Sequence, residues 1–441
     1  MNADGGMDDP EPSLARGALT GQVGAVTLAV VNSQAYASRQ RRGLLAATLA
    51  QMMVATSTLA LAPLASLVQA EFDLTLSELG VVLAAGAMGS LFVAVPAGWF
   101  CDVLGVRRVV FAGLILGGLS FGLVGLAGTM PLAVVLLLCS GLGTGVISPG
   151  TTKGILYWFP ARLRGTAMGV KQTGYALGGG LTAATLPTLA LVLGGWRPAV
   201  LIVGVVGTLV ALAYGFLYSE HPQQGHAASG QPAGLAQLRL VLTDPRILSL
   251  AALAFCYGYN QSTLMGYLSL YTQEALGVEI VEAGLFLMLS QVSGAAGRLG
   301  WGVISDRFFA GRRAPVLGAV TAVGGFTALV FGSLVPLLPV VGQGLLIVLF
   351  GLAAIGWSGL YHVFVGETSG RENAGTAIGV CMMVCAAGTI IGPPVFGYIV
   401  DVTHSYALAW ASQALTSFAG VALIWRTRGQ PEGAGALRTA E

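Results

Sequence analysis

Long apolar segments alternate with short polar connections along most of this chain. Twelve of them are long enough to cross a bilayer, because a transmembrane helix needs about 20 predominantly apolar residues. They lie near 44–70, 77–100, 108–128, 131–158, 165–192, 198–218, 246–271, 282–303, 314–334, 339–365, 374–399 and 407–425. We therefore predict an all-α integral membrane protein with twelve transmembrane helices.

One polar connection is longer than the others and separates the spans into two groups of six. The predicted organisation is a largely disordered cytoplasmic tail over 1–42, a six-helix bundle over 43–218, a cytoplasmic linker over 219–245, a second six-helix bundle over 246–426 and a cytoplasmic tail over 427–441. Residues 19–31 are apolar but too short to span. A short interfacial helix is therefore an alternative to disorder in the first tail.

Composition supports a lipid environment for most of the chain. Its 441 residues are 55% hydrophobic and only 9% charged, whereas a soluble domain carries about 25% charged residues. The five cysteines have no metal-ligand spacing, and their odd number argues against a disulfide framework. Nucleotide-binding loops and nucleophile arrangements are also missing. We predict no cofactor, no metal, no nucleic-acid partner and no enzymatic activity.

The arginines set the predicted orientation. With one exception, Arg197, those in connections and tails fall on one side of the twelve-span layout: Arg39, Arg41, Arg42, Arg107, Arg108, Arg162, Arg164, Arg239, Arg246, Arg307, Arg312, Arg313, Arg371, Arg426 and Arg428. Since loops on the cytoplasmic side are enriched in Lys and Arg, both termini and the linker are expected in the cytoplasm. The protein is expected to lie in the cytoplasmic membrane.

The two groups of spans carry the same motifs. The segment Gly98-Trp-Phe-Cys-Asp102-Val-Leu-Gly105-Val-Arg107-Arg108 is echoed by Gly302-Val-Ile-Ser-Asp306-Arg307-Phe-Phe-Ala-Gly311-Arg312-Arg313. The segment 164–170 is likewise echoed by 374–380, which share Gly-Thr-Ala-x-Gly-Val. These repeats predict two pseudo-symmetric bundles, a plan in which transporters bind substrate between the repeats.

Over residues 43–428 the chain resembles the major facilitator superfamily, whose signature loop is the repeated Gly-x-x-x-Asp-x-x-Gly-x-Arg-Arg block. The resemblance implies alternating-access transport. It also implies gating pairs that latch the cytoplasmic ends in the outward-facing state, formed by Asp102 with Arg107 or Arg108 and by Asp306 with Arg312 or Arg313. The alternative is that these arginines only set the topology.

Within the superfamily, Gly297-Arg298-Leu-Gly-Trp301-Gly-Val-Ile-Ser-Asp306-Arg307 resembles the branch of oxalate/formate antiporters and monocarboxylate porters. In that branch an arginine of span eight binds a carboxylate, which implies this role for Arg298. The chain departs from the oxalate/formate group because span eleven, 374–399, has no lysine. It also departs from proton-coupled drug exporters, because the segment 136–143 of span four lacks their arginine.

Four cationic candidates lie within the spans: Lys153, Lys171, Arg298 and His362. A charge in hydrocarbon costs about 2.5–3.5 kcal/mol on insertion scales, so such residues are functional candidates. The spans contain almost no carboxylate to neutralise them, and we expect an anionic substrate to do so. All four lie toward the inner ends of their helices, which leaves an alternative to substrate binding for each. The lysines could snorkel to the headgroups, Arg298 could pair with the loops, and His362 could be an interfacial histidine.

Polar residues on the predicted cavity helices complete the candidate binding site. Tyrosine and amide donors around a cation suit a small carboxylate, although hydrogen bonds between packed helices are the alternative for each. The remaining candidates are Gln51, Gln172, Tyr257, Asn260, Gln261, Tyr267 and Tyr361.

The sequence thus predicts a monomeric secondary transporter of a small organic anion, a mono- or dicarboxylate. Anion exchange, facilitated diffusion, or symport with a proton carried by the substrate or His362 remain open as coupling modes. An exporter of hydrophobic or zwitterionic compounds is the alternative transporter. A substrate sensor or membrane-embedded enzyme is a third possibility that no motif supports.

Overall fold

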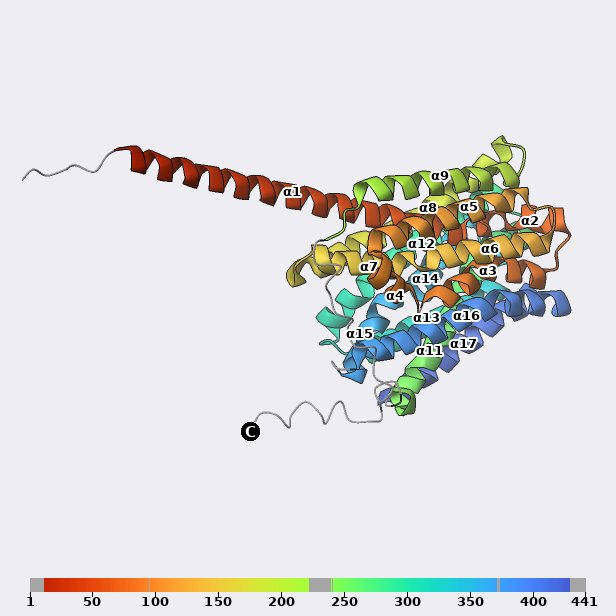
Figure 1. Cartoon of the computed structure of the whole chain (residues 1–441). Helices are drawn as coiled ribbons and strands as arrows, with labels where there is room; N and C mark the ends of the chain where they lie inside the picture. Colours follow the sequence, from red (N-terminus) through yellow and green to blue (C-terminus); the bar gives the residue numbers. More distant parts are fainter. Residues whose placement is uncertain (1–11, 95, 222–238, 240, 371–372, 429–441) are drawn as a thin grey trace, which may run out of the picture.

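A computed structural model describes residues 12–94, 96–221, 239, 241–370 and 373–428 of the chain, giving the backbone alone for 12–35, 94, 161, 162, 165 and 336. Every regular element in these ranges is a helix (Figure 1). The predicted all-α fold is confirmed for this part of the chain.

The N half comprises helices α1 to α9. Their bounds are α1 Pro12–Leu59, η1 Ala62–Leu64, α2 Ala65–Phe72, α3 Leu76–Ala94, α4 Pro96–Leu104, α5 Val106–Leu123, η2 Val124–Leu126, α6 Met130–Gly145, α7 Ile147–Trp158, α8 Ala161–Val192 and α9 Trp196–Leu217.

The C half comprises helices α11 to α17. Their bounds are α11 Pro245–Leu276, α12 Ile280–Phe308, α13 Arg313–Ser333, η3 Val335–Leu337, α14 Val340–Ala354, α15 Ser358–Ser369, α16 Ala374–Thr403 and α17 Tyr406–Arg428.

Eleven helical stretches in the described residues are long and apolar enough to cross a membrane. The predicted seventh span corresponds to α11, which is 32 residues long but falls outside this group. Its middle is more polar than the other spans, since Tyr257, Tyr259, Asn260 and Gln261 follow one another closely. Length and position nevertheless match the predicted span.

The first tail differs from its predicted disorder. Residues 12–42 form the beginning of α1, which is a single helix of 48 residues. Pro12 suits the first turn of a helix, and no further proline occurs before Pro63 to interrupt it. Residues 1–11, most of the linker and residues 429–441 lie outside the described ranges.

Two predicted spans are broken near their middle at corresponding places in the two halves. Span four divides at Val146 into α6 and α7, and span ten divides between Ala354 and Ser358 into α14 and α15. Pro149 lacks the N–H that would bond to the carbonyl of Gly145, which favours the first break. A broken helix leaves backbone carbonyls available to side chains.

Helix packing repeats between the halves. The pairs α1–α8, α3–α6 and α5–α9 correspond to α11–α16, α12–α14 and α13–α17. Gly178 and Gly388 occupy equivalent positions in the first of these pairs. A Cβ would lie 2.3 Å from the carbonyl oxygen of Met52 at Gly178 and 2.2 Å from that of Phe255 at Gly388. Only glycine permits backbones to approach this closely.

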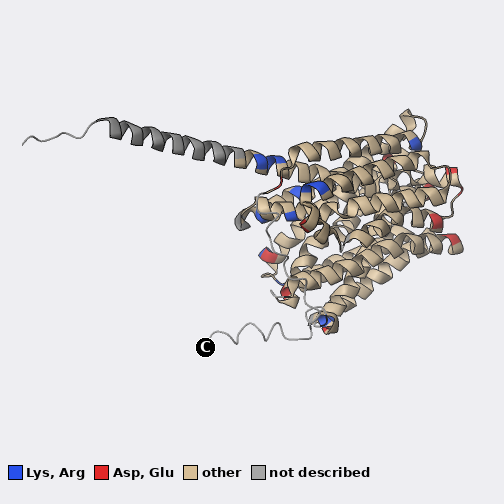
Figure 2. Ribbon diagram, viewed as in Figure 1, with Lys and Arg blue, Asp and Glu red and all other residues tan. Residues whose placement is uncertain are grey.

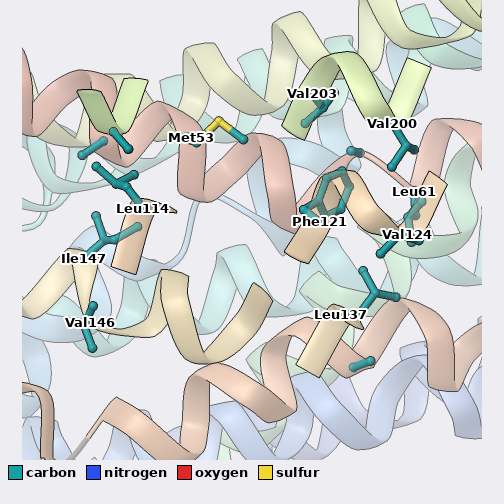
Figure 3. Close-up of a cluster of buried hydrophobic side chains, with 14 of the residues drawn as sticks. Met53, Leu61, Leu114, Phe121, Val124, Leu137, Val146, Ile147, Val200 and Val203 are labelled. Carbon is teal, nitrogen blue, oxygen red and sulfur yellow. The ribbon is translucent and has the colours of Figure 1, made fainter. Parts of the chain in front are cut away.

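The hydrophobic core has separate regions. One lies within the N half, where Met53, Leu114, Phe121 and Ile147 pack among several helices (Figure 3), and another lies within the C half. A third combines residues of both halves, including Leu59 and Leu79 with others from α11, α12 and α16.

Charged residues gather at the two ends of the helix bundle (Figure 2). We call the end with α4, α7 and α15 the basic end, since most of the described Lys and Arg residues lie there. The far end carries the connections before α3, α9 and α17. At the far end Arg197 forms an ion pair with Glu71, with 2.6 Å between Nε and Oε1.

Candidate functional site

Lys171 is buried inside the helix bundle. It lies on α8, is 2% exposed, and donates from Nζ to Oγ1 of Thr152 on α7 at 2.8 Å. None of the ion pairs in the described part of the chain includes it. A buried ammonium group with a hydroxyl as its hydrogen-bond partner is poorly compensated, so this site favours an anion.

Arg298 lies where the two halves meet. Its Nε donates to the carbonyl oxygen of Ile355 at 3.3 Å, and this carbonyl belongs to the break between α14 and α15. The guanidinium carbon lies 5.9 Å from the ring centre of Tyr175 on α8, within cation–π range. Tyr175 is one turn beyond Lys171, so α8 connects the two cations.

Arg298 also lacks a carboxylate partner among the described ion pairs. Arginine cannot lose its proton in a protein, and one hydrogen bond uses only a small part of its donor set. The guanidinium therefore retains donors for a planar anionic group such as a carboxylate.

The positive charge of Lys153 is neutralised by a carboxylate, unlike the charges of Lys171 and Arg298. Its Nζ forms an ion pair with Asp102 on α4, and the two side chains are 21% and 40% exposed. The sequence predicted Arg107 or Arg108 as the partner of Asp102 in the outward-facing state; in the described state the partner is Lys153, and the predicted pairing stays a prediction. Arg107 instead turns toward α9 and donates to the carbonyl of Gly215.

The second predicted gating pair is present. Arg313 forms an ion pair with Asp306 and lies 3.4 Å from Glu367 on α15. Arg312 is exposed and has no ion pair among those described. Both carboxylate–cation pairs join helices of the same half, so neither links the halves to each other. The latch role itself stays a prediction.

Three predicted binding residues form hydrogen bonds within the C half, and their role in substrate binding stays a prediction. The hydroxyl of Tyr257 bonds to Oγ1 of Thr321 at 2.6 Å, and that of Tyr361 donates to the carbonyl of Leu250 at 2.7 Å. Asn260 donates to Ser417 at 2.9 Å and accepts from Thr416 at 2.7 Å. Buried polar groups require such partners, and these side chains satisfy one another between helices.

The other predicted binding residues have different surroundings. Gln261 accepts from Nε1 of Trp357 at 3.0 Å, and His362 donates from Nδ1 to the carbonyl of Ser358 at 2.6 Å. Gln51 is 4% exposed, and its Oε1 has no hydrogen-bond partner among the described residues. Gln172 is exposed. Among the described residues, no hydrogen bond joins any of these four side chains to Lys171 or Arg298.

The halves are bonded to each other at the far end. The carboxylate of Asp401 on α16 accepts from the backbone N–H groups of Leu76 at 2.9 Å and Ser77 at 2.8 Å, at the start of α3. Tyr267 donates to the carbonyl of Leu76 at 2.5 Å, so this predicted binding residue belongs to the far end. An anion is favourable at a helix N-terminus. Among the described residues, all hydrogen bonds between the halves lie at this end.

A cavity of about 620 Å³ lies outside the candidate site. It lies beside α4, α5 and α9 at the basic end, and Arg108, Phe111, Phe216 and Glu220 are among its lining residues. Neither Lys171 nor Arg298 borders this cavity, and it does not lie between the halves. We therefore do not assign substrate binding to it.

Two intramembrane cations that lack carboxylate partners among the described residues, one from each of two repeated bundles, are typical of a membrane transporter. The sequence model of the Major Facilitator Superfamily matches residues 47–393. The protein belongs to this superfamily, and it is a multi-pass membrane transporter rather than an enzyme.

Several similar curated proteins are named as transporters of organic acids. The chain is 29% identical over 375 residues to the probable sulfoacetate transporter of Cupriavidus necator, covering 78% of this chain and 83% of the relative. It is 25% identical to the probable L-galactonate transporter of Escherichia coli, covering 78% and 79%. Identity to the hexuronate transporter of Bacillus subtilis is 22%, covering 85% and 92%. The superfamily is confirmed, whereas the oxalate/formate branch is not.

Solved structures show the same fold. A bacterial homologue of the human lysosomal transporter Spinster, inward-facing and occupied, gives a TM-score of 0.73 at 16% identity, covering 88% of this chain and 96% of that one. The xylose transporter XylE from Escherichia coli, inward open, gives 0.71 at 15% identity, covering 89% and 97%. At these identities the likeness concerns the twelve-helix architecture alone.

Tyr175 and the Ile355 carbonyl were missed by the sequence analysis. Tyr175 had a detectable signal, since it follows Lys171 by four residues and therefore shares its side of the helix. The Ile355 carbonyl had no sequence signal, because it is free to accept a hydrogen bond from a side chain only where α14 ends.

Proposed function

We propose that this transporter carries small organic anions and that Arg298 and Lys171 bind the anionic group. The observation that carries the proposal is the pair of cations without carboxylate partners, one from each half. Arg298 contacts Tyr175 of α8, the helix that also bears Lys171. An anion bound between them supplies the compensation that neighbouring side chains do not provide.

The relatives support the same substrate class. Sulfoacetate, galactonate and hexuronates are small acids that carry a negative charge at neutral pH, and the relatives are named for them. A charge-assisted hydrogen bond to an anion contributes about 1.5–3 kcal/mol. Such bonds offset part of the cost of burying the two cations.

We further propose that the described state faces the cytoplasm. The basic end is the cytoplasmic side by the enrichment of Lys and Arg there. Because the bonds between the halves lie at the far end, the external side is closed. Transport then requires breaking the contacts of Asp401 and Tyr267 with α3, so that the external side opens.

No described carboxylate pairs with either cation, so a coupling proton has no acidic carrier beside them. We therefore infer anion exchange or facilitated diffusion, with a proton-coupled mode confined to a protonated substrate or His362.

A thermal-stability screen of the purified full chain tests the anion site. Sulfoacetate, D-glucarate, phosphate, simple amines and lipophilic dyes are added separately, and we expect the organic acids to raise the melting temperature. Arg298→Ala should weaken binding of these acids by about tenfold or more, since it removes charge-assisted hydrogen bonds.

Arg307→Ala is the matched control, because Arg307 is an exposed arginine further along the same helix. It should retain the response to acids. Stabilisation by dyes and amines but by none of the acids contradicts the proposal and favours an exporter of hydrophobic compounds.

A further inference from the structure

Gln291 is a buried polar residue that is not part of the anion site proposed at Lys171 and Arg298. It is 3% exposed and lies on α12, two turns before Arg298 and on the same side of the helix. Its Nε2 is enclosed and has no hydrogen-bond partner among the described residues. An amide donor in this condition destabilises the protein unless another state or a ligand satisfies it.

The amide of Gln291 is directed across the boundary between the halves. A Cβ built on Gly179 of α8 would lie 3.5 Å from Nε2 of Gln291 and 2.8 Å from Cδ1 of Leu59. The glycine therefore leaves the space into which this amide points. A larger residue at this position would have to displace Leu59 and would crowd the donor.

Helix α8 gives the separation between the two donor groups. The guanidinium of Arg298 lies opposite Tyr175, and the amide of Gln291 lies opposite Gly179. Tyr175 and Gly179 are about 6 Å apart along α8, and Gln291 and Arg298 are about 10 Å apart along α12, so the two donor groups are separated by about 6–10 Å. An acid with polar groups at both ends of a short carbon chain has a comparable length.

Neighbouring polar residues on α12 do not share the condition of Gln291. The hydroxyl of Ser290 donates to the carbonyl of Leu287 at 2.7 Å, and that of Ser293 donates to the carbonyl of Ser290 at 3.0 Å. Such short side chains satisfy themselves on their own helix. The longer glutamine side chain leaves its helix and reaches the other half, where it finds no acceptor.

We propose that Gln291 donates a hydrogen bond to a second oxygen-bearing group of the substrate, while Arg298 binds its anionic group. This inference rests on the proposed function and narrows the substrate class. The substrate is a bifunctional acid with a hydroxyl, carboxylate or sulfonate about one to two helical turns from its anionic group. An acid with an apolar tail leaves the amide of Gln291 unpaired and binds more weakly.

The test compares two acids with six carbon atoms, D-glucarate and hexanoate, on the full chain in liposomes. Uptake of labelled D-glucarate is measured in counterflow, and unlabelled hexanoate is added as a competitor. Gln291→Met keeps the length of the side chain but removes the donor. It should raise the D-glucarate concentration for half-maximal uptake by about tenfold or more and leave inhibition by hexanoate unchanged.

Two further variants separate binding from folding. Gln291→Asn keeps an amide donor on a shorter side chain and should retain more D-glucarate affinity than Gln291→Met. Gln343→Met is the matched control, because Gln343 is also buried, at 7% exposure, with an unpartnered Oε1 at the start of α14. It should leave the affinities for both acids unchanged.

The outcomes distinguish the inference from the function on which it rests. Equal loss of D-glucarate and hexanoate affinity in Gln291→Met, or no loss of either, overturns the role of Gln291 and leaves anion transport intact. A wild-type protein that neither transports nor binds D-glucarate, sulfoacetate or hexanoate overturns the proposed function itself.

Discussion

Lys153 and Lys171 show how a neighbour from another helix decides the role of a residue. Both are lysines near the basic end, and the sequence favoured Lys171 for function because polar Gln172 and Thr173 follow it. Lys153 faces Asp102 and forms an ion pair, whereas Lys171 faces the hydroxyl of Thr152. The sequence located both charges within the spans. It could not identify their partners, because these come from other helices.

Replacing Lys171 with methionine tests whether its charge serves binding or structure. Methionine has similar length and no charge, so the substitution removes a buried cation without a large change in volume. Replacing buried charges by apolar residues is often neutral or stabilising. We expect an unchanged or higher melting temperature, together with about tenfold weaker binding of organic acids in a thermal-stability titration.

Lys153→Met provides the comparison. It removes a partly exposed ion pair, which contributes about 0–1 kcal/mol, and should retain acid binding. If Lys171→Met lowers the melting temperature markedly while acid affinity stays normal, Lys171 has a structural role and its place in the site is wrong.

Helix packing was predictable in kind but not in detail. Spans five and eleven contain closely spaced glycines, and the structure places Gly178 and Gly388 against the backbones of α1 and α11. The polar residues of α11 were expected in a cavity; Tyr257 and Asn260 bond within the C half, whereas Tyr267 bonds to the N half. The sequence shows that a helix contains polar residues. When the helix is buried on most sides, however, no amphipathic pattern shows which neighbouring helix each polar side chain faces.

Two glycines on α8 offer a direct test of this packing. Gly178→Ala places a methyl group 2.3 Å from the Met52 carbonyl oxygen, whereas a Cβ on Gly169 meets nothing within 4 Å. Overpacking costs about 1–3 kcal/mol, so Gly178→Ala should lower the melting temperature. Gly169→Ala should leave it unchanged or raise it, since alanine favours helix formation. Equal melting temperatures for the two variants would refute the close packing of α1 and α8.

At the scale of the whole molecule, the repeated architecture followed from the sequence, because span length, arginine placement and duplicated motifs all depend on local residues. Which end is closed did not follow. That property depends on contacts such as Asp401 with the start of α3, which join residues from different halves. The same holds for the proposed site. Lys171 and Arg298 could be proposed from the sequence because charges within apolar spans are visible there, whereas the contacts of Tyr175 with Arg298 and of Gln291 with Gly179 join different helices.

Alternating access predicts that a bound acid exchanges between the two sides of the membrane. The anion site lies between halves that are bonded at the far end, so a bound acid can be released at the basic end in the described state. Exchange across the membrane requires the same acid to be accepted from the other side after the far end opens. Uptake should therefore increase when unlabelled acid is present inside the vesicle.

Counterflow in liposomes tests the central claim most directly. The full chain is reconstituted in vesicles preloaded with unlabelled sulfoacetate or D-glucarate, and entry of the labelled acid is followed. We predict saturable uptake above that of protein-free vesicles, reduced about tenfold or more at low concentration by Arg298→Ala and preserved in Arg307→Ala. Uptake equal to protein-free vesicles for every organic acid, with movement of lipophilic dyes instead, would contradict the account.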